Sequence, residues 1–249
     1  MDRRNFLSAL LAAPVVHLRR RSDSGAREAA VEFQPSKSAF ILCDMWDKHW
    51  CRGANERLAP IVEKAGPLLD AARRKGAVII HAPSDTMDYY QDAPQRRAAL
   101  ATPKVQPPAL LDINAPPLPI DDAGGGCDTG DKSFKAWTRQ HPGISVAVQD
   151  YVTDKGDEVY SILKARGIQT LYILGVHTNM CILNRTFAIK QMTRWGVRCV
   201  LIRDLTDAMY NPADRPFVTH AQGTNLVIEH IERYWCPSVT SAELLAALG

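Results

Sequence analysis

The segment LYILGVHTNMC, residues 171–181, decides the fold that we predict for this chain. It opens with an apolar run that ends at Leu174, which is typical of a strand buried on both faces. The run breaks at Gly175, and a helix is predicted from about Cys181 to Trp195. A tight turn of this kind places a cysteine between the end of a strand and the start of a helix.

Strand-like and helix-like segments alternate on both sides of this segment. Predicted strands cover residues 39–43, 78–81, 144–148, 170–174 and 197–202, and a short edge strand begins at Val239. Predicted helices cover residues 55–75, 157–166, 181–195 and 217–235, the last interrupted at Gly223. This alternation predicts an α/β fold, a three-layer α/β/α sandwich around a mostly parallel, roughly six-stranded, Rossmann-like sheet.

The connection between residues 83 and 142 is long and has no strong periodicity. It is rich in proline, glycine and aspartate. A connection of this length is usually a lid or a binding loop rather than a missed element. We therefore expect substrate specificity to reside in it, and its lack of a motif leaves the substrate unnamed.

The composition excludes several classes of protein. The chain has 249 residues, 46% of them hydrophobic and 23% charged, which suits a single globular domain. A net charge of +3 without a long basic run argues against a nucleic-acid partner. Six cysteines without a CxxC pair indicate neither a zinc knuckle nor a disulfide framework, and favour one reactive thiol among inert ones.

The first residues, MDRRNFLSALLAAPVVHL, combine an arginine pair with a short apolar stretch. This order is typical of a twin-arginine export signal, and the apolar part is too short to span a bilayer. We expect residues 1–30 to be a signal and linker, with a polar linker from about Arg19 to Ser36, and residues 31–249 to be the folded domain. The protein is then exported, periplasmic or extracytoplasmic, without stable membrane insertion. The alternative is an amphipathic tail on a cytoplasmic protein.

Cys181 and Asp44 are the candidate chemical groups. Asp44 directly follows the apolar run at residues 39–43, so both side chains are predicted at the carboxyl edge of one parallel sheet. A helix N-terminus favours a thiolate, its free N–H groups can bind an oxyanion, and a neighbouring carboxylate can act as a base. The alternatives are a packed cysteine that begins a helix and an aspartate that caps a strand.

Two motifs resemble the isochorismatase-like cysteine hydrolases, a family that includes nicotinamidases and related amidohydrolases. The motifs are AFILCDM at residues 39–45 and GVHTNMC at residues 175–181, and the resemblance extends over roughly residues 36 to 210. It implies an α/β/α sandwich and an Asp, Lys, Cys triad, in which the aspartate takes the thiol proton and the cysteine attacks a carbonyl carbon. Asp44 and Cys181 match this triad by motif.

The resemblance also implies an oxyanion hole and an activity. The peptide between Val176 and His177 should be cis, with the backbone N–H groups of His177 and Cys181 binding the oxyanion. The implied activity is hydrolysis of a C–N bond in a small amide through a thioester on Cys181. The alternatives are hydrolysis of a vinyl ether such as isochorismate, which some family members perform without a cysteine, and a non-catalytic small-molecule-binding protein.

The lysine of the triad is not where the family places it, which in this chain is near Gln149. Lys155 is the nearest lysine and is the predicted third member. Its side chain can reach Asp44 and Cys181 only if its loop folds back, and it otherwise faces solvent. Lys132 and Lys135 are more distant candidates.

No metal site and no cofactor are predicted. The nicotinamidase branch carries an Asp-x-His pair and a further histidine near the second strand, whereas residues 81–86 here read HAPSDT. Asp47 and His49 follow the first strand instead, and with His81 they are weak candidates to meet around an ion. Isolated histidines are more often hydrogen-bonded structural residues.

Four aromatic residues are predicted near the mouth of the site: Trp46, Trp50, Trp137 and Tyr210. They are candidates to wall a small planar or apolar substrate, and rim packing is the alternative. The family commonly self-associates, so the resemblance also implies a homo-oligomer.

Overall fold

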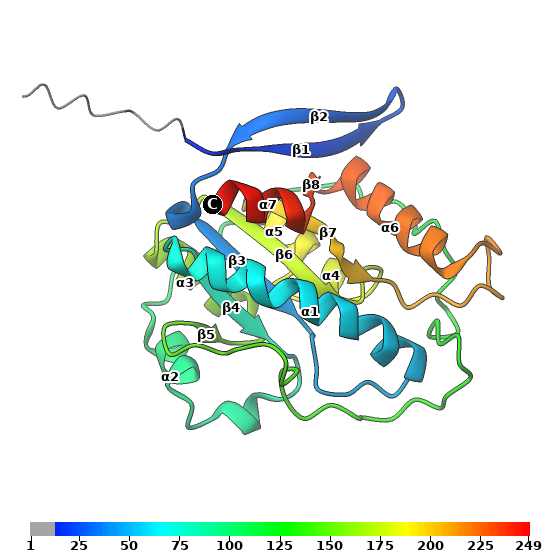
Figure 1. Ribbon diagram of the computed structural model, residues 1–249, viewed down its shortest axis with the longest axis horizontal. Helices are drawn as coiled ribbons and strands as arrows, with labels where there is room; N and C mark the ends of the chain where they lie inside the picture. Colours follow the sequence, from blue (N-terminus) through cyan, green and yellow to red (C-terminus); the bar gives the residue numbers. More distant parts are fainter. Residues whose placement is uncertain (1–12) are drawn as a thin grey trace, which may run out of the picture.

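The computed structural model describes residues 13–249 and contains one eight-stranded sheet of order β2-β1-β8-β7-β6-β3-β4-β5 (Figure 1). The strands are β1 (Val15–Ser22), β2 (Gly25–Glu32), β3 (Ser38–Cys43), β4 (Val78–Ala82), β5 (Tyr151–Val152), β6 (Thr170–Val176), β7 (Cys199–Asp207) and β8 (Ser238–Val239). Strands β3 to β8 pair in parallel, whereas β1 is antiparallel to both β2 and β8. The predicted α/β class with a mostly parallel sheet is confirmed.

Helices cover both faces of this sheet. They are α1 (Arg52–Arg74), α2 (Pro94–Ala101), α3 (Gly156–Ala165), α4 (Cys181–Asn184), α5 (Ile189–Arg194), α6 (His220–Tyr234) and α7 (Ser241–Leu248), with 3-10 turns η1 (Pro35–Lys37) and η2 (Met87–Tyr90). None of the helices between residues 13 and 249 has the length and apolar character needed to span a bilayer.

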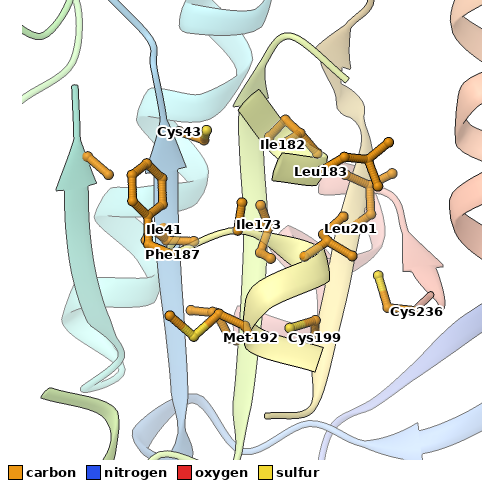
Figure 2. Packing of buried hydrophobic residues seen from close by; sticks show 14 of the residues in the cluster. Ile41, Cys43, Ile173, Ile182, Leu183, Phe187, Met192, Cys199, Leu201 and Cys236 are labelled. Carbon is orange, nitrogen blue, oxygen red and sulfur yellow. The ribbon is translucent and has the colours of Figure 1, made fainter. Parts of the chain in front are cut away.

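Alternate residues of the central strands point to opposite faces of the sheet and so build two cores. Phe40 and Leu42 of β3 pack with apolar residues of α1 and α7. Ile41 and Cys43 pack on the other face with residues of α3, α4, α5 and α6, and Figure 2 shows part of this cluster. Burial on both faces explains why the central strands read as continuous apolar runs. It also confirms the three-layer arrangement.

A hairpin of β1 and β2 occupies the region where a linker was predicted. β1 joins the sheet through Arg19, which pairs with Ser238 of β8. The guanidinium groups of Arg19 and Arg21 hold the buried carboxylate of Glu232 at N–O distances of 2.8 and 3.1 Å. The predicted linker from Arg19 to Ser36 is therefore wrong, although most residues of β2 face solvent. The part of the predicted signal that precedes residue 13 lies outside the described residues.

Other predicted elements differ in detail. The helix expected over residues 181–195 is two short helices, α4 and α5, separated by residues 185–188. The strand expected at residues 144–148 is a loop, and β5 pairs with β4. β8 does not lie at the edge, because β1 pairs with it. α6 continues through Gly223, whose lack of a side chain makes room for the ring of Tyr210.

The carboxyl ends of β3 and β6 lie side by side, with Cys43 opposite Gly175. Gly175 has a φ of 113°, and a Cβ at this position would lie 2.0 Å from the carbonyl oxygen of Cys43. Only glycine fits both the conformation and the space. The close approach therefore fixes the relative position of the two segments that follow, which carry Asp44 and Cys181.

We expect Gly175→Ala to lower the free energy of unfolding by at least about 2 kcal/mol, because the added Cβ meets backbone that cannot move aside and the left-handed φ is strained. Gly124→Ala is the matched control, since nothing lies within 4 Å of its Cβ position. Urea denaturation followed by circular dichroism measures both variants. Equal stability of the two variants would contradict the close approach of β3 and β6.

Candidate active site

Asp44 is the first residue after β3 and is fully buried. Its φ of 50° turns the chain at the end of the strand. The carboxylate accepts the backbone N–H of Ser84 at 2.7 Å through Oδ1 and the Nε–H of Arg185 at 2.9 Å through Oδ2. Burial raises the pKa of Asp44, and Arg185, the Cys181 thiol and Ser84 oppose this rise because they stabilise the carboxylate. Asp44 is thus a buried acid whose charge depends on its partners.

Cys181 begins α4, and its thiol lies so close to the Asp44 carboxylate that each group shifts the pKa of the other. The structure therefore brings the two predicted groups into contact at the ends of β3 and β6. Burial, and then the negative charge of Asp44, raise the pKa of the Cys181 thiol well above its usual range.

The raised pKa runs against the expectation that the helix N-terminus favours a thiolate at Cys181. α4 has only four residues, and the cost of burying a thiolate outweighs the attraction of so short a helix. The raised pKa favours the neutral thiol at Cys181. The sulfur becomes a strong nucleophile as its proton moves to Asp44.

Arg185 supplies the cation beside this pair, and the sequence analysis missed it. It lies between α4 and α5 in extended conformation, with φ −61° and ψ 151°. Its guanidinium contacts Asp44 and also lies 3.4 Å from Oδ2 of Asp85. Burial alone lowers the pKa of Arg185. The neighbouring carboxylate of Asp44 raises it by more, so the pKa lies above its usual value and the group stays charged.

The structure does not place Lys155 in this group. Its Nζ lies 3.0 Å from Oδ1 of Asp154, and 58% of its side chain is exposed. Its prediction as third member is therefore wrong, and the solvent-facing alternative holds. Arg185 had one usable signal, because it follows Cys181 by four residues, a spacing at which side chains share a helix face.

The backbone around Cys181 offers donors for an oxyanion. The Val176–His177 peptide is cis, as the family resemblance implied. The backbone N–H of His177 lies near the sulfur of Cys181 and lowers the pKa of its thiol. The next N–H, that of Thr178, is already used by the carbonyl of Asp207 at 2.9 Å. Within residues 13–249 no carbonyl accepts the N–H of Cys181, which leaves it, with that of His177, beside the sulfur.

An aromatic group lies next to His177. The ring of His49 meets that of His177 at a centroid distance of 4.9 Å, and Trp46 stacks on Trp137 at 4.3 Å. His49 also stacks on Trp137 at 5.9 Å and meets Trp50 at 5.1 Å. Burial lowers the pKa of His177 to about 3 and that of His49 to about 4, so both imidazoles are neutral at pH 7. Contact of these tryptophans with substrate stays a prediction.

Tyr210 does not belong to this aromatic group. It is fully buried, packs against Gly223 of α6, and its hydroxyl donates to the carbonyl of Asp214 at 2.9 Å. The prediction that it walls the substrate is wrong, because its ring fills the core between β7 and α6.

The three weak metal candidates are held apart by separate partners. The carboxylate of Asp47 accepts the backbone N–H and the hydroxyl of Thr138 at 2.8 and 2.5 Å. His81 is fully buried, and its Nε2 lies 3.0 Å from Oδ2 of Asp150. His49 is engaged in the aromatic group. The structure therefore does not gather Asp47, His49 and His81 around an ion.

Cys181 and Arg185 open onto a cavity of about 560 Å³. Its other lining residues come from the long loop, the turn before α4, α4 and α5: Leu118, Asp122, Asn179, Met180, Asn184 and Lys190. The lining mixes apolar, amide and charged groups, and its volume suits a small molecule.

The fold and the site together define a class: an α/β protein with a parallel sheet that carries a cysteine and an acid at its carboxyl edge. Residues 127–230 match the model of the Isochorismatase domain, so this part of the chain is similar to that family. The matched segment includes Cys181, whereas Asp44 precedes it.

Solved structures agree with this fold. A cysteine hydrolase from Pseudomonas syringae pv. phaseolicola has a TM-score of 0.56 and 17% identity, over 96% of this chain and 98% of that one. A putative hydrolase of the isochorismatase family from Chromobacterium violaceum has a TM-score of 0.53 and 16% identity, over 89% and 98%. The MAR1 ribonuclease from Caenorhabditis elegans has a TM-score of 0.51 and 14% identity, over 88% and 84%. A comparison with curated proteins found no match.

Proposed function

We propose that the protein is a cysteine hydrolase that cleaves a C–N bond in a small amide through a thioester on Cys181. The observation that supports this proposal most directly is the closeness of the Cys181 thiol to the buried Asp44 carboxylate, through which each group shifts the pKa of the other. A nucleophile in contact with its base at the wall of a cavity is the arrangement that covalent catalysis requires.

The first half of the reaction forms the thioester. As Sγ of Cys181 bonds to the amide carbon, the thiol proton moves to Asp44, and the carbonyl oxygen becomes an oxyanion. The backbone N–H groups of His177 and Cys181 stabilise that oxyanion. The C–N bond then breaks, and the leaving amine takes the proton from Asp44.

The second half releases the acid. Asp44 removes a proton from a water molecule, whose oxygen attacks the thioester carbon, and the C–S bond breaks. The proton returns to the sulfur, so the free enzyme is restored. Arg185 stabilises the carboxylate form of Asp44 in both halves, which is the form that accepts a proton.

The neutral aromatic group suits an uncharged planar amide. His49 and His177 carry no charge at pH 7, and the Trp46 and Trp137 rings stack parallel to the imidazole of His49. Neutral rings do not repel an amide, and the lowered pKa of both imidazoles makes them weak bases that compete poorly with Asp44 for the thiol proton. We therefore favour small aromatic or aliphatic primary amides over charged substrates.

The test is a panel of acetamide, benzamide and nicotinamide, with ammonia release measured by a coupled assay, and isochorismate with pyruvate release. Ammonia release from at least one amide, with no pyruvate from isochorismate, is the expected result. Pyruvate release would support the vinyl ether hydrolase instead. Saturable binding of an amide with no turnover would identify the chain as a binding protein.

A further inference from the structure

A cluster of two cysteines and one aspartate lies outside the candidate active site. Cys51 immediately precedes α1 and is buried, whereas Cys127 and Asp131 belong to the long loop and are progressively more exposed. A thiol of Cys51, a thiol of Cys127 and a carboxylate oxygen of Asp131 all lie within 4.8 Å of one another. Residues far apart in sequence thus place three metal-binding atoms at one point.

The loop that carries two of these atoms is anchored to the rest of the protein by several contacts. Asp128 pairs with Arg57 of α1 at 2.7 Å, and the backbone N–H of Arg52 donates to Oδ2 of Asp131 at 2.8 Å. Gly126 packs so closely on the carbonyl of Met209 that a Cβ would lie 2.2 Å from its oxygen. The three donor atoms are therefore positioned by the surrounding structure, as a preorganised site requires.

A hydroxyl links the three groups. Oγ1 of Thr129 lies 3.5 Å from Sγ of Cys51 and 3.4 Å from Sγ of Cys127, and it donates to Oδ2 of Asp131 at 2.6 Å. This hydrogen bond orients the carboxylate toward the thiols. Such outer contacts orient the ligands of protein metal sites.

We propose that Cys51, Cys127 and Asp131 bind one Zn²⁺ ion, with water in the fourth position. Two thiolates and one carboxylate oxygen are zinc ligands, whereas Mg²⁺ and Ca²⁺ require oxygen ligands throughout. Zinc–sulfur bonds of about 2.3 Å place tetrahedral ligands about 3.8 Å apart, so the three atoms need to approach by no more than about 1 Å. The exposed side chain of Asp131 leaves the fourth position open to solvent.

The ion would tie the long loop to the start of α1. Cys51 and Cys127 pack with Met209 and Met180, and Met180 directly precedes Cys181. The proposed site is thus a neighbour of the candidate active site without sharing a residue with it. Its expected effect is on the stability of this region, because metal binding joins two segments that are distant in sequence.

The test uses Co²⁺ as a spectroscopic probe of the fully reduced, full-length protein. We expect one equivalent of Co²⁺ to produce a thiolate-to-cobalt charge-transfer band with tetrahedral d–d absorption, and one equivalent of Zn²⁺ to remove it. Zn²⁺ should also raise the Tm. Absence of the band at stoichiometric Co²⁺ would overturn the proposal.

Variants identify the ligands. Cys127→Ser and Asp131→Asn should each weaken Co²⁺ binding at least about tenfold, and Cys51→Ser should remove the charge-transfer band if the variant folds. Cys181→Ser is the matched control and should bind Co²⁺ as the wild type does, because it lies outside the cluster. Equal loss in Cys181→Ser would overturn the assignment. A Cys51–Cys127 disulfide in protein purified without reductant, together with no metal uptake after reduction, would also overturn it.

Discussion

A Cys181→Ala variant is expected to reduce kcat for amide hydrolysis at least about 1,000-fold, because it removes the atom that forms the thioester. The remaining site keeps Asp44, Arg185 and the backbone donors, but none of them can replace the sulfur as nucleophile. Ammonia release from the best amide of the panel measures the loss. Mass spectrometry of quenched wild-type reactions should show the acyl group on the peptide that contains Cys181.

The control for this variant separates chemistry from folding. Cys236→Ala removes a thiol that is buried in the core on the α6 side of the sheet. At temperatures below its own Tm, this variant should hydrolyse the amide at the wild-type rate. Cys181→Ala should have a Tm close to that of the wild type, because the side chain is partly exposed. Amide turnover that survives in Cys181→Ala would refute the thiol mechanism.

Arg185→Met is expected to reduce kcat/KM at neutral pH at least about 100-fold, the usual contribution of a positioned base. Arg185 lowers the pKa of Asp44 against the larger effect of burial, which raises it. Without the guanidinium the pKa of Asp44 rises further, so the carboxyl is protonated over a wider pH range. The acid limb of the kcat/KM profile should therefore move to higher pH, and activity should partly recover under alkaline conditions.

The matched comparison for this prediction is Lys155→Met. Lys155 is exposed and paired with Asp154, so its loss should leave the pH profile unchanged. Arg185→Lys keeps the charge with a shorter reach and should recover part of the lost rate. If Lys155→Met moved the acid limb while Arg185→Met did not, the lysine would be the third member after all.

The pair of Asp44 and Cys181 could be predicted because parallel strands end at the same edge of a sheet. Asp44 directly follows one buried apolar run and Cys181 follows another after a short turn, and the alternation of strands and helices makes those runs parallel neighbours. The register that places Cys43 opposite Gly175 was not needed for this prediction. The two cores could be predicted in the same way from the apolar strands.

Arg185 and the hairpin depend on information that local sequence patterns do not contain. The continuous helix predicted after Cys181 is interrupted at residues 185–188, where Gly156 of α3 packs against the backbone of Thr186. That contact joins segments about thirty residues apart, so periodicity within one segment cannot reveal it. The hairpin reads as a linker because most of β2 is exposed, and its pairing partner β8 lies near the other end of the chain.

The hairpin also limits where the chain could be shortened at its beginning. Removal of residues 1–30 would delete β1 and nearly all of β2, leave the carboxylate of Glu232 without Arg19 and Arg21, and uncover the free edge of β8. A buried carboxylate without a cation and a bare strand edge both favour aggregation over a stable monomeric fold. Any leader peptide that is cleaved on maturation must therefore end before Val15 if the sheet is to remain intact.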